Sequence, residues 1–302
     1  MTIAASAGST GPHSIPTTTD LSAGMAPHGL VLGAVSLASP DPRRLVAFYR
    51  DLLGLNVLAE GEATVLGAGG KPLVEILSRP SAPLAPRRAP GLFHMAIRVP
   101  DRTSLAARLL ALHGAGLRLG ASDHLVSEAL YVDDPDGNGV EIYRDLPRAE
   151  WPVQPDGSIA MQTLPLDLQA LAREAKAAGG PAPAGTDMGH VHLKVSDLDA
   201  AKRFWVDTVG LTIMARYPGA LFVSADGYHH HVGLNVWQSG GAPVPVAGTA
   251  GLDHFAVTLA ADAFAALAAR LAAAGVETQP SNDGALRVTD PSGNGVEFRA
   301  AA

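Results

Sequence analysis

Short apolar runs alternate with amphipathic segments along most of the chain. An apolar run near residues 31–37 precedes a segment, 41–53, whose apolar residues recur at helical spacing and which Gly54 closes. A run near 92–99 and a helical segment near 102–114 repeat this order. Further short Val, Ile and Leu runs, bounded by Gly and Asp, are typical of strands. The pattern therefore predicts successive βαβββ units.

The second half of the chain repeats the first. Residues 34–59 recur 156 positions later without a gap, and DPDGNGVEIYR at 134–144 recurs at the same offset as DPSGNGVEFRA. GLFHMAIRVPD at 91–101 recurs 160 positions later. Both DPxGNG segments are typical of hairpin turns, in which Gly supplies a positive φ. The sequence thus predicts an α+β fold of four βαβββ modules in two pairs, each pair forming a curved, open-barrel mixed sheet with helices outside.

The repeat also predicts the domain boundaries. Residues 1–28 are small, polar and proline-containing, so we expect a disordered tail that is not a signal peptide. Consecutive modules form the predicted pairs, a first domain at 29–150 and a second at 187–302. The segment between them, 151–186, is a linker that contains an amphipathic helix near 164–178.

Composition narrows the chemistry. The net charge of −7 argues against a nucleic-acid partner, which requires a basic face. No apolar stretch is long enough to cross a membrane, so we expect a cytoplasmic protein. The chain has no cysteine, which excludes thiolate nucleophiles and Cys-bound metals. Any metal site must be built from His, Asp and Glu.

Polar residues at matching places in the repeat suggest such a site. His190 and His192 alternate along one predicted strand and share a face, His254 lies on another first strand, and Glu297 lies on a last strand. Two histidines and a carboxylate on separate strands can converge on one side of a curved sheet. That set is typical of non-haem Fe(II) oxygenases, although catalytic zinc also uses it.

The first half keeps only part of this pattern. Ala34 stands where the second half has His190, while His94 and Glu141 remain. Since two protein ligands rarely hold a catalytic metal, we predict that the first domain has no working site. His94 is then a structural residue, and Glu141 a relic or an ion-pair partner.

Several motifs resemble those of a known superfamily. GHVHLKVSDL, LDHFAV and GNGVEF, at 189–198, 252–257 and 293–298, resemble the vicinal oxygen chelate superfamily of glyoxalases, bleomycin resistance proteins and extradiol dioxygenases. GYHHHVGLNVW at 227–237 and the segment from Asp123 to Trp151 are similar to bacterial catechol 2,3-dioxygenases of the type I extradiol class. The resemblance covers roughly residues 29–300.

The resemblance implies a metal, a reaction and partners. The family's iron ligands match His190, His254 and Glu297. The implied reaction is Fe(II)-dependent meta cleavage of a catechol with O2 to a muconic semialdehyde, with Mn(II) as the alternative metal. The partners would be a small aromatic diol and O2, without nucleic acid or membrane, and we expect a homo-oligomer.

Further site residues follow from the same resemblance. The family's acid–base histidine matches His230, with His229 and His231 pointing to the opposite face. His192 would be a neighbour of the ligands in the substrate site. The family usually has Tyr ten residues before the Glu ligand, where this chain has Arg287, and a guanidinium there could bind an oxyanion or a carboxylate of the substrate.

Two other classes of function stay open. A glyoxalase-like, metal-dependent isomerase or lyase would require a fourth protein ligand, a carboxylate on the last strand of the third module. The nearest residue there is Asn235, a poor ligand, which matches Glu75 in the first half. The other alternative is a metal-free protein that binds a small aromatic molecule. Because one architecture hosts several chemistries, the fold does not choose among them.

Overall fold

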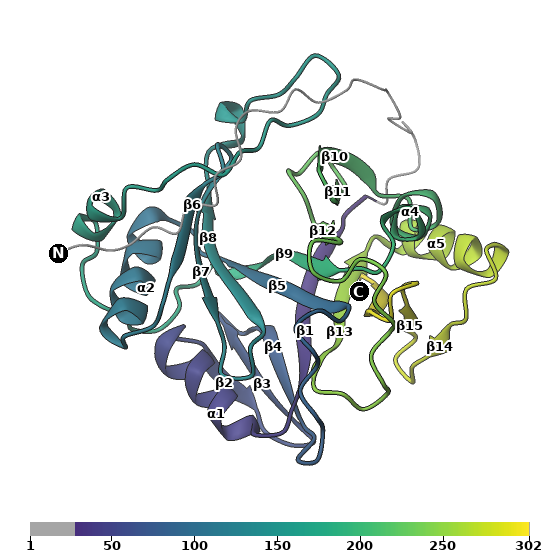
Figure 1. Cartoon of the computed structure of the whole chain (residues 1–302), viewed down its shortest axis with the longest axis horizontal. Coiled ribbons are helices and arrows are strands. Elements are labelled where there is room, and N and C mark those ends of the chain that lie inside the picture. The colour runs from purple at the N-terminus through teal and green to yellow at the C-terminus, as the bar shows by residue number, and fades with distance from the viewer. Residues whose placement is uncertain (1–27, 302) are drawn as a thin grey trace.

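The computed structural model describes residues 28–301, so the tail expected at 1–28 lies almost wholly outside the described residues (Figure 1). The first module consists of β1 (Val31–Ser39), α1 (Pro42–Ala47), the π-helical η1 (Phe48–Leu52), β2 (Asn56–Ala59), β3 (Ala63–Ala68) and β4 (Lys71–Ser78). The second consists of β5 (Gly91–Arg98), α2 (Arg102–Gly114), β6 (Gly120–Asp123), β7 (Ser127–Asp133) and β8 (Gly139–Asp145). Both follow the predicted βαβββ order.

The second half has the same composition. The third module consists of β9 (Asp187–Lys194), α4 (Leu198–Lys202), the π-helical η3 (Arg203–Thr208), β10 (Thr212–Tyr217), β11 (Ala220–Ser224) and β12 (Val232–Asn235). The fourth consists of β13 (Gly251–Leu259), α5 (Ala261–Ala273), β14 (Gln279–Pro280), β15 (Leu286–Thr289) and β16 (Gly295–Ala300). The connecting segment carries the 3₁₀-helix η2 (Arg148–Glu150) and α3 (Leu168–Arg173), which is shorter than predicted.

The modules build two eight-stranded mixed sheets, as expected for this α+β fold. One sheet has the order β14-β15-β16-β13-β1-β4-β3-β2 and joins modules one and four; we call it the 1–4 sheet. The other has the order β10-β11-β12-β9-β5-β8-β7-β6 and joins modules two and three; we call it the 2–3 sheet. The prediction that consecutive modules pair was therefore wrong, because β1 runs antiparallel to β13 and β5 antiparallel to β9.

Strand alternation separates an apolar face from a polar face in both sheets. Val191 and Leu193 of β9 enter the hydrophobic core, whereas His190 and His192 point to the other side of the strand. Strand β13 repeats this pattern, with Phe255 in the core. The helices add leucines to the same core, and Figure 1 shows them outside the sheets. The chemically active side chains consequently gather on the face that the helices do not cover.

The DPxGNG segments form the predicted hairpin turns. Between β7 and β8, the amide of Asp134 donates to the carbonyl of Asn138 at 2.8 Å, and Gly137 has a φ of 86°. The turn between β15 and β16 has the same bond from Asp290 to Asn294 at 2.9 Å. Each turn fixes the register of the last strand of its module. No helix within residues 28–301 combines the length and apolar character needed to cross a membrane.

Candidate metal centre

Three buried side chains meet on the polar face of the 2–3 sheet. They are His94 of β5, Glu141 of β8 and His190 of β9, and one ligand atom of each lies within 4.8 Å of the others. Glu141 Oε2 is 3.0 Å from His94 Nε2 and 3.1 Å from His190 Nε2. The pairing of β5 with both β8 and β9 brings the three together. Among residues 28–301, these three side chains are close enough to one another to hold a metal ion.

The electrostatics of the cluster suit a divalent cation. Burial alone would raise the pKa of Glu141, but His190, which hydrogen-bonds to it, and the neighbouring His94 hold that pKa well below its usual range. Burial lowers the pKa of His190 to about 4. At neutral pH the cluster therefore offers a carboxylate and a neutral imidazole. His94 Nε2 lies close to Glu141 without hydrogen-bond geometry and has no partner among the described residues. A buried donor set with an orphaned nitrogen fits a metal ion.

The ligand set predicted from the sequence is not assembled. His190 lies in the cluster, but His254 and Glu297 lie in the 1–4 sheet. There the guanidinium of Arg287 lies 3.0 Å from the ring nitrogens of His254 and 3.6 Å from Glu297 Oε2. The prediction took its partners from module four, whereas the sheet pairs module three with module two.

The same pairing makes His94 and Glu141 candidate ligands, although the sequence predicted that they are structural residues of a domain without a working site. Within their own half of the chain, Ala34 stands where a third ligand would be needed. The structure instead supplies His190 from the second half, and both residues contact it or its carboxylate partner. Ala34 lines a separate polar cavity of ≈ 360 Å³ in the 1–4 sheet, together with Glu75, Arg79, Asp253, His254, Arg287 and Glu297.

The histidine triplet lies beside the cluster. The ring centroid of His230 is 4.1 Å from that of His190. His229 was predicted to face the opposite side, but it is buried and its Nδ1 lies 2.8 Å from Nδ1 of His230. Alternation fails here because β12 begins only at Val232, so the triplet lies in the preceding loop. His231 does point elsewhere, with Nδ1 2.8 Å from Ser224 Oγ.

His192 also lies next to the cluster. Its ring centroid is 4.9 Å from that of His94, and its Nε2 lies 3.0 Å from the amide nitrogen of Asn235. Gly233 makes room for this ring, because a Cβ at that position would lie 2.7 Å from it. The role of His192 toward a substrate stays a proposal.

Two residues near the cluster were missed. Tyr131 pairs with Glu141 across β7 and β8, and its ring lies 5.6 Å from that of His94. His124 Nε2 is 2.7 Å from its hydroxyl. Tyr131 stands ten residues before Glu141, just as Arg287 stands ten residues before Glu297. The tyrosine that the resemblance leads one to expect before the Glu ligand is therefore present when the count starts from Glu141. The same count made from Glu141 instead of Glu297 would have found it.

The buried histidines predict a loss of stability in mild acid. Burial lowers the pKa of His231 to about 3 from 6.5, so the unfolded chain binds the extra proton between these pH values. Stability is then fully present above about pH 6.5 and falls as the pH drops toward the folded-state pKa. From pH 7 to pH 5, this one residue should remove about 2 kcal/mol from the free energy of unfolding.

Urea unfolding at pH 7 and pH 5 checks this prediction. His231→Gln keeps an acceptor for Ser224 but cannot titrate, so its loss between the two pH values should be smaller than that of the unaltered chain by about 2 kcal/mol. An equal loss in both proteins would show that His231 does not carry the effect.

Comparison with known proteins places the chain in a family. Residues 31–142 and 187–298 match the family model described as the Glyoxalase/Bleomycin resistance protein/Dioxygenase superfamily, and the chain belongs to this superfamily. It is 40% identical over 275 residues to a catechol-2,3-dioxygenase of Bacillus subtilis (strain 168), covering 88% of this chain and 96% of that protein.

Solved structures share the fold. A suspected dioxygenase from Bacillus subtilis has a TM-score of 0.61 at 16% identity, covering 91% of this chain and 85% of that one. Glyoxalase I from Zea mays has a TM-score of 0.54 at 15% identity, covering 89% of this chain and 92% of that one. At such low identities the likeness concerns the fold and not the reaction.

Proposed function

We propose that the protein is an Fe(II)-dependent extradiol dioxygenase that cleaves a catechol beside its diol with O2 and yields a muconic semialdehyde. The buried cluster of His94, Glu141 and His190 carries the proposal. The name of the Bacillus subtilis relative supports the same reaction. The ligand roles predicted for His254 and Glu297, and the substrate role of Arg287, are not part of it.

The three ligands leave positions free for substrate. Ferrous iron held by two histidines and one carboxylate would supply open coordination positions and electrons for the reaction of O2 with the diol. Glu141, His94 and the neutral ring of His190 would hold the ion. Manganese has similar ligand preferences and is the alternative metal.

The surrounding residues are suited to an aromatic diol. The ring of Phe93 lies 4.9 Å from that of His192, and Phe222 lies 4.9 Å from His230, so aromatic walls border the histidines. Burial, and then the nearby Glu141, raise the pKa of Tyr131, which keeps its hydroxyl protonated and able to donate to a diol oxygen. The proposal also keeps His192 as a substrate-side neighbour of the ligands.

His230 is suited to move a proton. Burial, followed by the neighbouring histidines, lowers its pKa well below the ordinary value, so the ring is neutral at pH 7 and has a lone pair that can accept a proton. Its Nδ1 faces His229, while its Nε2 has no hydrogen-bond partner among the described residues. We assign to this nitrogen the removal of a proton from the bound diol and its later return.

The structure weighs against a four-ligand isomerase. In β8, Glu141 pairs with Ala96, and the equivalent residue of β12, which pairs with His192, is Gly233. The residue expected from the sequence, Asn235, is engaged inside the protein. Its amide nitrogen lies 3.0 Å from His192 Nε2, and its oxygen accepts from the amide of Trp237 at 3.2 Å. A neutral amide held in this way supplies no carboxylate to the cluster.

Oxygen uptake after anaerobic Fe(II) loading tests the proposal. With a panel of catechols, we expect one bound metal per chain, uptake of one O2 per catechol and a yellow ring-opened product. Loading with Mn(II) in parallel decides between the two metals. Tight binding of one metal without uptake on any catechol would contradict the proposal and favour a lyase or isomerase, and absence of metal binding would favour a binding protein.

A further inference from the structure

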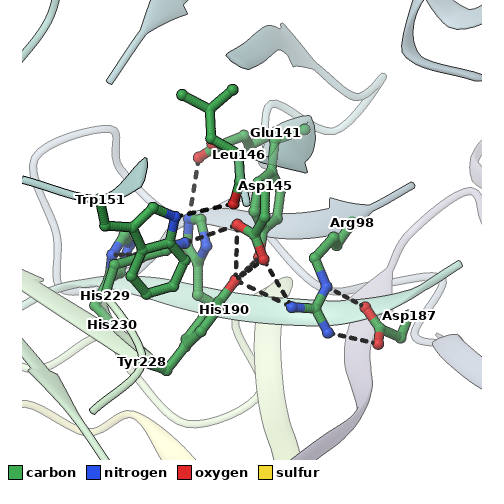
Figure 2. Close-up of polar contacts among 11 residues, drawn as sticks. Arg98, Glu141, Asp145, Leu146, Trp151, Asp187, His190, Tyr228, His229 and His230 are labelled. Carbon is green, nitrogen blue, oxygen red and sulfur yellow. Dashed lines mark hydrogen bonds and ion pairs between the residues drawn. The ribbon is translucent and has the colours of Figure 1, made fainter. Parts of the chain in front are cut away.

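A buried chain of polar contacts leads from Asp145 to His230 (Figure 2). Asp145 Oδ1 lies 3.0 Å from His229 Nε2, and His229 Nδ1 lies 2.8 Å from His230 Nδ1. His229 is 1% exposed and His230 is 8% exposed, so water cannot substitute freely for these partners. The chain ends at a ring that packs against the metal-cluster residue His190.

The carboxylate of Asp145 is fixed at its other oxygen. Arg98 donates from Nη1 to Oδ2 at 2.8 Å and forms a two-point ion pair with Asp187 through Nε and Nη2. The hydroxyl of Tyr228 also donates to Asp145, at 3.0 Å to Oδ2. Burial alone would raise the pKa of Asp145, but the bonds from His229 and Arg98 hold it below its usual range.

With both rings neutral, the donors and acceptors along this chain have one consistent order. Ionised Asp145 can only accept, so His229 carries its hydrogen on Nε2 and has a bare Nδ1. That Nδ1 must accept, so His230 carries its hydrogen on Nδ1. A neutral imidazole has one N–H, which leaves Nε2 of His230 with a free lone pair.

We propose that Asp145 is a positioning residue that acts through His229 to hold His230 in the tautomer whose Nε2 lone pair is free toward the substrate. This proposal rests on the proposed dioxygenase function. It adds to that function an explanation of how the acid–base residue His230 is held in its active tautomer. A hydrogen-bonded carboxylate that fixes an imidazole tautomer is a general device of acid–base sites.

The repeat supports a specific role for this chain of contacts. At an offset of 156, Asp145 matches Ala301. The strand registers match β12 to β4 at an offset of 158, which places Lys71 and Pro72 where the other half has His229 and His230. The 1–4 sheet thus lacks every member, although it shares the fold. Asp145 also lies on the same face of β8 as Glu141, four residues along, so one strand supplies both the ligand and the orienting carboxylate.

The variant Asp145→Asn tests the tautomer directly. Because Arg98 only donates, it retains the amide oxygen of the new side chain and turns the NH2 group toward His229. His229 must then accept at Nε2 and donate from Nδ1, which forces His230 to accept at Nδ1 and to carry its hydrogen on Nε2. We expect kcat to fall about 100-fold or more, with KM and bound metal nearly unchanged.

Asp187→Asn is the matched control. It alters the same Arg98 network on the side that does not touch His229, and we expect less than about a threefold change in kcat. Long-range 1H–15N spectra of the full-length, metal-free chain give an independent readout. They should show Nδ1-protonated His230 in the unaltered protein and Nε2-protonated His230 in Asp145→Asn.

The outcomes separate the two proposals. An inactive unaltered protein contradicts the dioxygenase function, whereas an active one with equally active Asp145→Asn and an unchanged tautomer overturns the positioning role alone. A variant that loses metal and fold together with activity also overturns it, in favour of a structural role. An intact fold with slow turnover and the exchanged tautomer supports it.

Discussion

His94→Ala should lose the metal and all detectable turnover, while His254→Ala should keep both. The two histidines occupy the same place in the repeat, 160 residues apart, on first strands of the same type. Only His94 lies 3.0 Å from a carboxylate that His190 also contacts. Removing one of three protein ligands should weaken metal binding by at least about 100-fold, more than the loss of a supporting residue typically costs.

Metal content and oxygen uptake of the two variants check this result. Circular dichroism shows whether both stay folded, which matters because His94→Ala leaves the buried Glu141 with one histidine fewer. Loss of metal from His254→Ala with retention in His94→Ala would restore the assignment made from the sequence and remove the 2–3 sheet from the mechanism.

The variant His230→Gln should bind metal normally and turn over slowly. General acid–base groups typically contribute about 10²- to 10⁴-fold in rate, and an amide cannot exchange a proton in their place. We therefore expect kcat to fall by about 10²-fold or more while one metal per chain is retained. The effect should appear in single-turnover oxygen uptake, since the missing step belongs to chemistry and not to metal loading.

His231→Gln is the matched control for this variant. It changes the next residue of the same triplet, whose ring bonds to Ser224 and stacks near Tyr228 instead of His190. Its turnover should equal that of the unaltered protein. A similar fall in both variants would indicate that loop packing, and not the proton chemistry of His230, sets the rate.

Local features of the fold could be predicted from the sequence because they depend on short-range chemistry. The helix at 102–114 and the GNG turns were found from spacing and glycine. The choice of partners could not be predicted in this way. Strands β5 and β13 carry the same alternation and the same histidine, so the pattern of β9 fits either neighbour equally well.

The candidate site shows the same division. The sequence predicted a site of two histidines and one carboxylate that includes His190, and the structure contains a cluster of this composition around His190. The sequence favoured His254 and Glu297 because the second half of the chain contains all three residues of the pattern. In the structure, the 2–3 sheet instead brings His190 next to His94 and Glu141. The contact between His229 and Asp145 joins residues 84 positions apart and depends on a loop conformation, which no periodicity encodes.

The pairing of module one with four and of module two with three resembles a domain-swapped dimer of two-module subunits in which the two subunits are linked as one polypeptide. Each sheet takes four strands from either half, so neither half can complete a sheet by itself. Two pseudo-symmetric sites arise in such an arrangement, and a single chain can vary them independently, which identical subunits cannot do. In this chain the two places differ: Ala34 and Arg287 line the cavity of the 1–4 sheet, whereas the 2–3 sheet brings His94, Glu141 and His190 together. A single chain with this pairing can therefore carry different polar residues in its two sheets.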